Sequence, residues 1–128
     1  MPRFTKSERI VSQKLIDELF SGNSSHSLAA FPLRAVYMLR PVAAAEPPVQ
    51  LLISVPKRRF KHAVDRNRVK RQLREAFRLS KQLLADHVPA GQQVALAFIW
   101  LSDQHQPSTA IAHRVQSLLK RIASHLKS

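Results

Sequence analysis

The chain has 128 residues, with 21 Lys and Arg against 8 Asp and Glu, so its formal net charge is +13. A 45% apolar composition suits one folded domain over residues 1–128 rather than a disordered basic tail, and the lack of cysteine excludes disulfides, thiolate nucleophiles and cysteine zinc sites. A charge of this size favours a polyanionic partner, with nucleic acid ahead of an anionic membrane surface.

The N-terminal half predicts one helix and two strands after a short basic arm of about residues 1–10. The stretch SQKLIDELFSG places Leu15, Ile16, Leu19 and Phe20 on one helical face, with Ser12 as N-cap and Gly22 as a stop. FPLRAVYMLR and VQLLISV are rich in apolar and β-branched residues, which favours strands on either side of the Pro- and Ala-rich link PVAAAEPP.

The C-terminal half predicts a helix, a strand and a second helix. The first helix is basic and is expected from about Val64 to Asp86, with Pro89 and Gly91 ending it. QVALAFIWLS is short and nearly all apolar, as in a buried strand. The second helix is predicted to start at Ser108, because apolar residues from Ile111 to Leu126 recur with a helical period. The predicted order is α-β-β-α-β-α.

The basic helix separates apolar from charged side chains. Val69, Leu73, Ala76, Leu83 and Leu84 share one arc, with Phe77 at its edge, while the neighbouring arc carries Asn67, Lys70, Arg71, Arg74, Arg78 and Lys81. Like charges at i,i+4 on that arc repel, and we expect Glu75 to pair with Arg71. Ten of the 21 basic residues lie between Lys57 and Arg78, so we interpret this surface as one that binds phosphates rather than a merely solvated face.

The string RNRVKRQLREAF, residues 66–77, resembles the signature of the bacterial ribonuclease P protein component. The similarity extends to ISVPKRR and AVDRNR upstream, and to FTKSERI and KLIDELFSG near the N-terminus. The resemblance implies an α+β sandwich with a four-stranded sheet and a left-handed β-α-β crossover through the basic helix. It also implies a cytoplasmic ribonucleoprotein in which an RNA subunit is the catalyst.

The resemblance further implies that the protein binds the catalytic RNA subunit and the 5′ leader of precursor tRNA, and assists magnesium-dependent removal of that leader. The residues that match positions facing the RNA subunit are Lys57, Arg58, Arg66, Asn67, Arg68, Lys70, Arg71 and Arg74. The implied leader cleft lies between the first helix and the sheet, where Phe20 and Tyr37 match aromatic positions and Ile16 replaces a frequent aromatic. From the residues alone, Phe20 is more often core than a stacking platform, Tyr37 could face either side, and Asn67 could simply start the helix.

No catalytic or metal-ligating constellation is apparent in the sequence. The 8 acids show no paired spacing, the 6 histidines show no ligand motif, and the 2 glycines form no phosphate loop. We therefore expect the RNA to hold the Mg²⁺, with no organic cofactor, membrane or obligate protein partner. The alternative function is a ribosomal or nucleoid RNA- or DNA-binding protein, and the ordered Arg-Asn-Arg argues against it because nonspecific binding requires only charge.

Overall fold

The computed structural model describes residues 4–22, 24–43 and 45–127. A short 3-10 helix η1 (Lys6–Glu8) and helix α1 (Gln13–Ser21) precede strands β1 (His26–Ala30), β2 (Leu33–Pro41) and β3 (Val49–Ser54). Helices α2 (Ala63–Ser80) and α3 (Gln82–Ala85), strand β4 (Gln92–Trp100) and helix α4 (Ser108–Leu126) complete the chain. Ser12 and Gly22 bound α1 as expected: the Ser12 side chain accepts from the Leu15 amide, and Gly22 takes a φ of 92°.

The sheet has four strands in the order β1-β2-β4-β3. β1 with β2 and β2 with β4 are antiparallel, whereas β3 and β4 are parallel. The segment containing α2 and α3 is therefore a crossover between adjacent parallel strands, as parallel pairing requires. The predicted four-stranded α+β sandwich is confirmed, while the left hand of the crossover stays a prediction.

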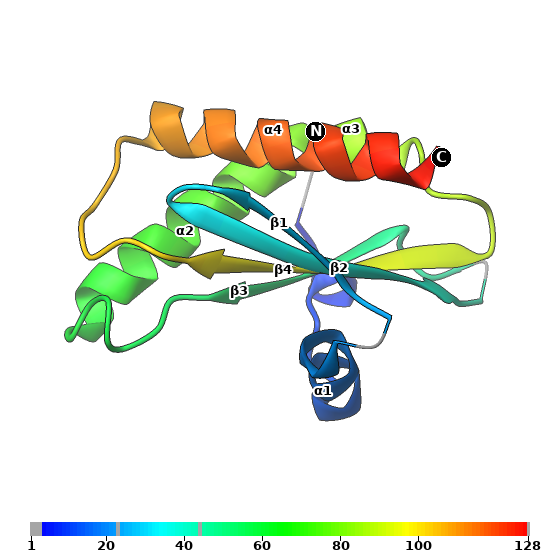
Figure 1. Cartoon of the computed structure of the whole chain (residues 1–128), viewed down its shortest axis with the longest axis horizontal. Coiled ribbons are helices and arrows are strands. Elements are labelled where there is room, and N and C mark those ends of the chain that lie inside the picture. The colour runs from blue at the N-terminus through cyan, green and yellow to red at the C-terminus, as the bar shows by residue number, and fades with distance from the viewer. Residues whose placement is uncertain (1–3, 23, 44, 128) are drawn as a thin grey trace.

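The two faces of the sheet are covered unequally (Figure 1). The larger core lies between the sheet and helices α2 and α4, and its largest side chains include Trp100, Phe77 and Phe98. The smaller core lies under α1, where Leu15 and Leu19 meet Val36 and Met38 of β2. Alternate residues of β2 thus face opposite layers, and this determines where each of its side chains can act.

Strand β1 was not predicted, because its residues read as the end of a polar loop. It pairs with β2 only, from His26 opposite Tyr37 to Ala30 opposite Leu33. An edge strand is hydrogen-bonded on one side only, so polar residues are tolerated in it: Ser27 points outward, and His26 lies against the Tyr37 ring at the end of the strand. The fourth strand of the sheet is therefore formed by residues His26–Ala30.

The basic helix is shorter than predicted and is followed by a separate turn of helix. α2 ends at Ser80. The Ser80 hydroxyl donates a hydrogen bond to the Ala76 carbonyl, which in a regular helix accepts only from a backbone amide. Such a bond competes with helix continuation. Lys81 then leads into α3, and its amine contacts the Glu8 carboxylate at 2.9 Å.

Residues 4–10 pack against the domain. Glu8 and Ile10 are buried, and the Ile10 amide donates to the Leu51 carbonyl at 3.0 Å. The Phe4 ring meets Phe77 edge to face, with 5.7 Å between centroids. The expected basic arm is therefore fixed across β3 and α2 over its described part.

Candidate nucleic-acid interface

One side of α2 carries the charge that the sequence predicts there. Val69, Leu73, Ala76 and Phe77 are buried, so the helix is anchored by its apolar arc. On the outside, Asn67, Arg68 and Arg71 are exposed and Lys70 and Arg74 are half-buried. The structure brings these residues onto one accessible surface, which we call the basic arc (Asn67, Arg68, Lys70, Arg71 and Arg74).

The single acid among these bases does not neutralise the basic arc. Glu75 pairs with Arg78 instead of the predicted Arg71, with Arg78 Nη2 2.6 Å from Glu75 Oε1 and Nε 3.0 Å from Oε2. The hydrogen bond from Arg78, reinforced by its charge, lowers the pKa of Glu75 despite an opposing desolvation effect. Arg78 forms this two-point contact at i,i+3, a geometry that suits guanidinium and carboxylate. The charges of the basic arc consequently remain unpaired among the described ion pairs.

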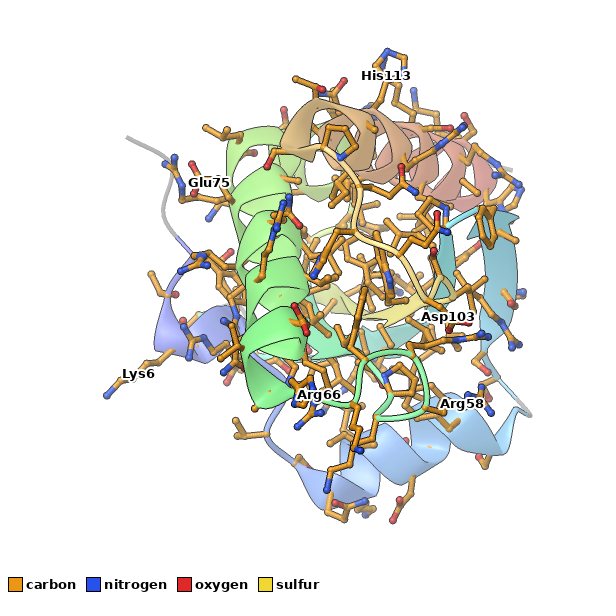
Figure 2. The ribbon with its side chains drawn as sticks, turned by 90° about the vertical axis from the view of Figure 1, so that its left-hand side faces the viewer. Lys6, Arg58, Arg66, Glu75, Asp103 and His113 are labelled. Carbon is orange, nitrogen blue, oxygen red and sulfur yellow. The ribbon has the colours of Figure 1, made fainter. Side chains whose placement is uncertain are left out.

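Arg66 connects the basic arc to the preceding loop, residues 56–62. Its Nη1 donates to the carbonyls of Phe60 and Lys61, both at 2.9 Å. Figure 2 shows Arg66 at the start of α2 and Arg58 on the adjacent loop. Arg66 was predicted only as an RNA contact, and the structure gives it a structural task as well. Lys57 and Arg58 are exposed on this loop.

The loop between β4 and α4 contacts residues 56–62 and the start of α2. The His105 ring stacks on Phe60 with 4.5 Å between centroids and 17° between planes, and its Nε2 lies 3.0 Å from Asp65 Oδ1. Asp103 Oδ1 lies 3.4 Å from Arg59 Nη1. Sequence reasoning missed His105 and Asp103 because they are about forty positions away from their partners, and nothing in a local pattern indicates such a pairing.

The residues expected to bind a leader do not form one wall. Phe20 is 46% exposed on α1, and Ile16 is half-buried beside the smaller core. Tyr37 is 3% exposed and lies on the opposite face of the sheet, where its hydroxyl is 2.8 Å from His125 Nδ1. The expectation that Phe20 and Tyr37 line one leader cleft is wrong. Successive side chains of β2 point to opposite faces of the sheet, and Tyr37 points toward α4, away from α1. Burial raises the pKa of Tyr37.

A groove of about 450 Å³ lies on the α1 side, between the first helix and the sheet, and its charged lining was not predicted. We call it the α1 groove. It lies between α1, the end of β2 and the following link, and its charged lining side chains are Arg9, Lys14, Glu18, Arg40 and Glu46. Arg9 belongs to the N-terminal arm and Arg40 to the end of β2, so only the fold brings them together.

Two other features are absent from residues 4–22, 24–43 and 45–127. No cluster of three or more His, Cys, Asp or Glu side chains with metal-binding geometry is found there. None of the helices in this part of the chain is both long and apolar enough to cross a membrane.

The fold and the basic arc together define a small α+β protein of the nucleic-acid-binding class. A helix face of unpaired cations is the feature by which such proteins attract a polyanion. A family model described as Ribonuclease P matches residues 4–123. The ribonuclease P protein component of Porphyromonas gingivalis ATCC 33277 is 38% identical over 125 residues, covering 97% of this chain and 89% of the relative. That of Chlorobaculum tepidum is 45% identical over 67 residues, 48% of this chain and 44% of the relative.

Solved structures agree on the fold. The RNase P protein from Thermotoga maritima superposes with a TM-score of 0.66 at 23% identity, covering 89% of this chain and 96% of that one. The same protein in complex with 1-(4-fluorophenyl)-2-thiourea gives 0.62. The chain belongs to the ribonuclease P protein component family. It is thus the protein subunit of the endoribonuclease that processes the 5′ end of tRNA, and its family implies a ribonuclease P RNA as partner.

Proposed function

We propose that the basic arc and the loop before it bind the catalytic RNA subunit, and that the α1 side binds the 5′ leader of precursor tRNA. The observation that carries the proposal is the basic arc itself, whose charges have no acidic partner in the described structure. Like charges at i,i+4 destabilise a free helix, and a phosphate backbone relieves that repulsion. The residues in this role are Lys57, Arg58, Arg66, Asn67, Arg68, Lys70, Arg71 and Arg74.

The leader surface is proposed on α1. Phe20 presents an exposed aromatic ring there, and the α1 groove supplies Arg9, Lys14 and Arg40. An aromatic ring for stacking and cations for the backbone are the features that suit single-stranded RNA of any sequence. Tyr37 has no part in this surface because it is buried against α4.

The chemistry is assigned to the RNA subunit, which would hold the magnesium that activates the attacking water. The protein would position the two RNAs and lower the electrostatic cost of bringing them together. We infer that it acts in the cytoplasm, where bacterial tRNA precursors are made.

Reconstitution tests the proposal directly. The protein is mixed with the RNA subunit from the same organism at low magnesium, and 5′ leader cleavage of precursor tRNA is followed with and without it. We expect faster cleavage and tighter precursor binding with the protein. Cleavage that is unchanged by the protein at every magnesium concentration would refute the proposed role.

A further inference from the structure

Arg9 and Arg74 come from distant parts of the chain and line the same small pocket, of about 150 Å³. Its remaining lining is apolar: Phe4, Ile10, Val11, Leu51, Leu52 and Ile53. Burial, together with the nearby Arg9 charge, lowers the pKa of Arg74. The guanidinium groups of the exposed Arg9 and the partly buried Arg74 thus line one pocket that is otherwise mainly apolar.

No acid balances this pair in the described residues. The neighbouring carboxylates are already used, since Glu8 bonds Lys81 at 2.9 Å and Glu75 bonds Arg78 at 2.6 Å. Neither Arg9 nor Arg74 takes part in any ion pair of residues 4–22, 24–43 and 45–127. Both guanidinium charges are therefore without an acidic partner among the described ion pairs.

The position of Arg9 is fixed by its surroundings. Its guanidinium carbon lies 5.3 Å from the centroid of the Phe4 ring, which itself packs edge to face on Phe77. The backbone of Arg9 bridges to Leu51 of β3, and the buried Glu8 side chain beside it is tied to Lys81. Because these contacts exist before any ligand binds, little ordering would be needed on binding.

We propose that Arg9 and Arg74 form a phosphate-binding site that takes one backbone phosphate of an RNA strand. Two guanidinium groups are the side chains that best match the oxygens of a phosphate. Arg9 and Val11 also line the α1 groove, and Arg74 belongs to the basic arc. The site thus connects the surface proposed for the leader with the surface proposed for the RNA subunit.

The first experiment uses inorganic phosphate and the full chain, at constant ionic strength. Thermal unfolding is followed against phosphate concentration, since a ligand of the native state stabilises by RT ln(1 + [L]/Kd). Arg9→Gln and Arg74→Gln should each weaken the apparent phosphate affinity about tenfold, the loss of one charged contact. Arg114→Gln, at an exposed position on α4, removes the same charge and should change it less than about twofold.

A second readout keeps the proposal testable if a glutamine variant does not fold. Arg9→Lys retains the charge and should retain most of the phosphate response, and in the wild-type protein the Nε resonances of Arg9 and Arg74 should shift together on phosphate titration. If the Arg9 and Arg74 variants respond to phosphate as Arg114→Gln does, or if these two resonances do not move, the site does not exist.

The second experiment identifies the source of the phosphate, and only this part depends on the proposed function. Binding to the ribonuclease P RNA subunit carrying precursor tRNA is measured against salt for wild type and Arg9→Gln. A slope of log affinity on log salt that is shallower by roughly 0.7 to 0.9 assigns the site to one RNA phosphate. If Arg9→Gln loses the response to inorganic phosphate but keeps the wild-type salt slope, the phosphate bound at this site does not come from the RNA. Failure of the wild-type protein to bind the RNA would instead refute the proposed function while the phosphate titration stands.

Discussion

Arg66 shows how one side chain can belong to a binding motif and to the fold at once. Its Nη1 bonds two successive carbonyls of the loop that carries Lys57 and Arg58. Main-chain carbonyls at a loop end otherwise need water or a cap. A loss of RNA affinity in an Arg66 variant would therefore combine a missing charge with a displaced loop.

Arg66→Ala should lower the free energy of unfolding by about 1–3 kcal/mol, because two charge-assisted hydrogen bonds to the loop are lost. Urea unfolding measures this, with Arg68→Ala as the matched control, since Arg68 is exposed on the same helix. Equal stability of the two variants would show that the bonds to Phe60 and Lys61 contribute nothing to the folded state.

Phe20 and Tyr37 should behave differently although both are aromatic. Phe20→Ala should weaken precursor tRNA more than mature tRNA, by about 1–3 kcal/mol at most, because an exposed ring can stack on a leader base. Tyr37→Phe should instead lower stability by about 0.5–1.5 kcal/mol through loss of the bond to His125, with the same affinity for both RNAs.

Binding assays with precursor and mature tRNA, together with urea unfolding of each variant, separate these outcomes. If Tyr37→Phe no longer discriminates between precursor and mature tRNA while Phe20→Ala still does, the leader does not lie on α1.

At the scale of one element, α2 combines an anchored face with an unneutralised one. Lys70→Ala or Arg71→Ala should make the dependence of log affinity for the RNA subunit on log salt shallower by roughly 0.7 to 0.9 per lost phosphate contact. Filter binding over a range of salt concentrations measures the slope. Arg114→Ala on α4 is the control and should leave it unchanged, so a slope that changes equally in all variants would mean that only total charge matters.

The ion pair between Glu75 and Arg78 gives α2 a pH dependence of known sign. The pKa of Glu75 is lowered in the folded state, so its stabilising effect is fully present above the unfolded pKa of a glutamate and is lost as pH falls through the folded one. Glu75→Gln should therefore be less stable than wild type near neutral pH, and the difference should disappear in acid. Denaturant unfolding from pH 7 to pH 2 measures it, and a difference independent of pH would indicate a packing effect instead.

At the scale of the whole molecule, the sequence predicted what depends on local pattern. The period of apolar residues located α1 and α4, and the run from Val49 located β3. β1 was not predicted, because an edge strand can be polar. The contacts of His105 and Arg9 were not predicted either, because their partners are distant in sequence. The face of Tyr37 likewise followed only from the register of β2 with β4.

Hydrogen exchange should show which part of the molecule opens last. β4 is paired on both sides, with β2 and β3, and its side chains from Val94 to Phe98 are fully buried. Amides of β4 should therefore exchange only through global unfolding, whereas those of the edge strand β1 exchange by local opening. Equal protection in β1 and β4 would mean that the sheet opens as one unit.

The central position of β4 also sets the order of events during synthesis. β2 and β3 both need β4 beside them, yet β4 is made after α2, so the nascent chain exposes its basic helix before the sheet can close. Non-local pairing of this kind is slow, and the domain can complete it only after Trp100 has left the ribosome. The cationic face of α2 is thus synthesised before the strand that completes the sheet beneath it.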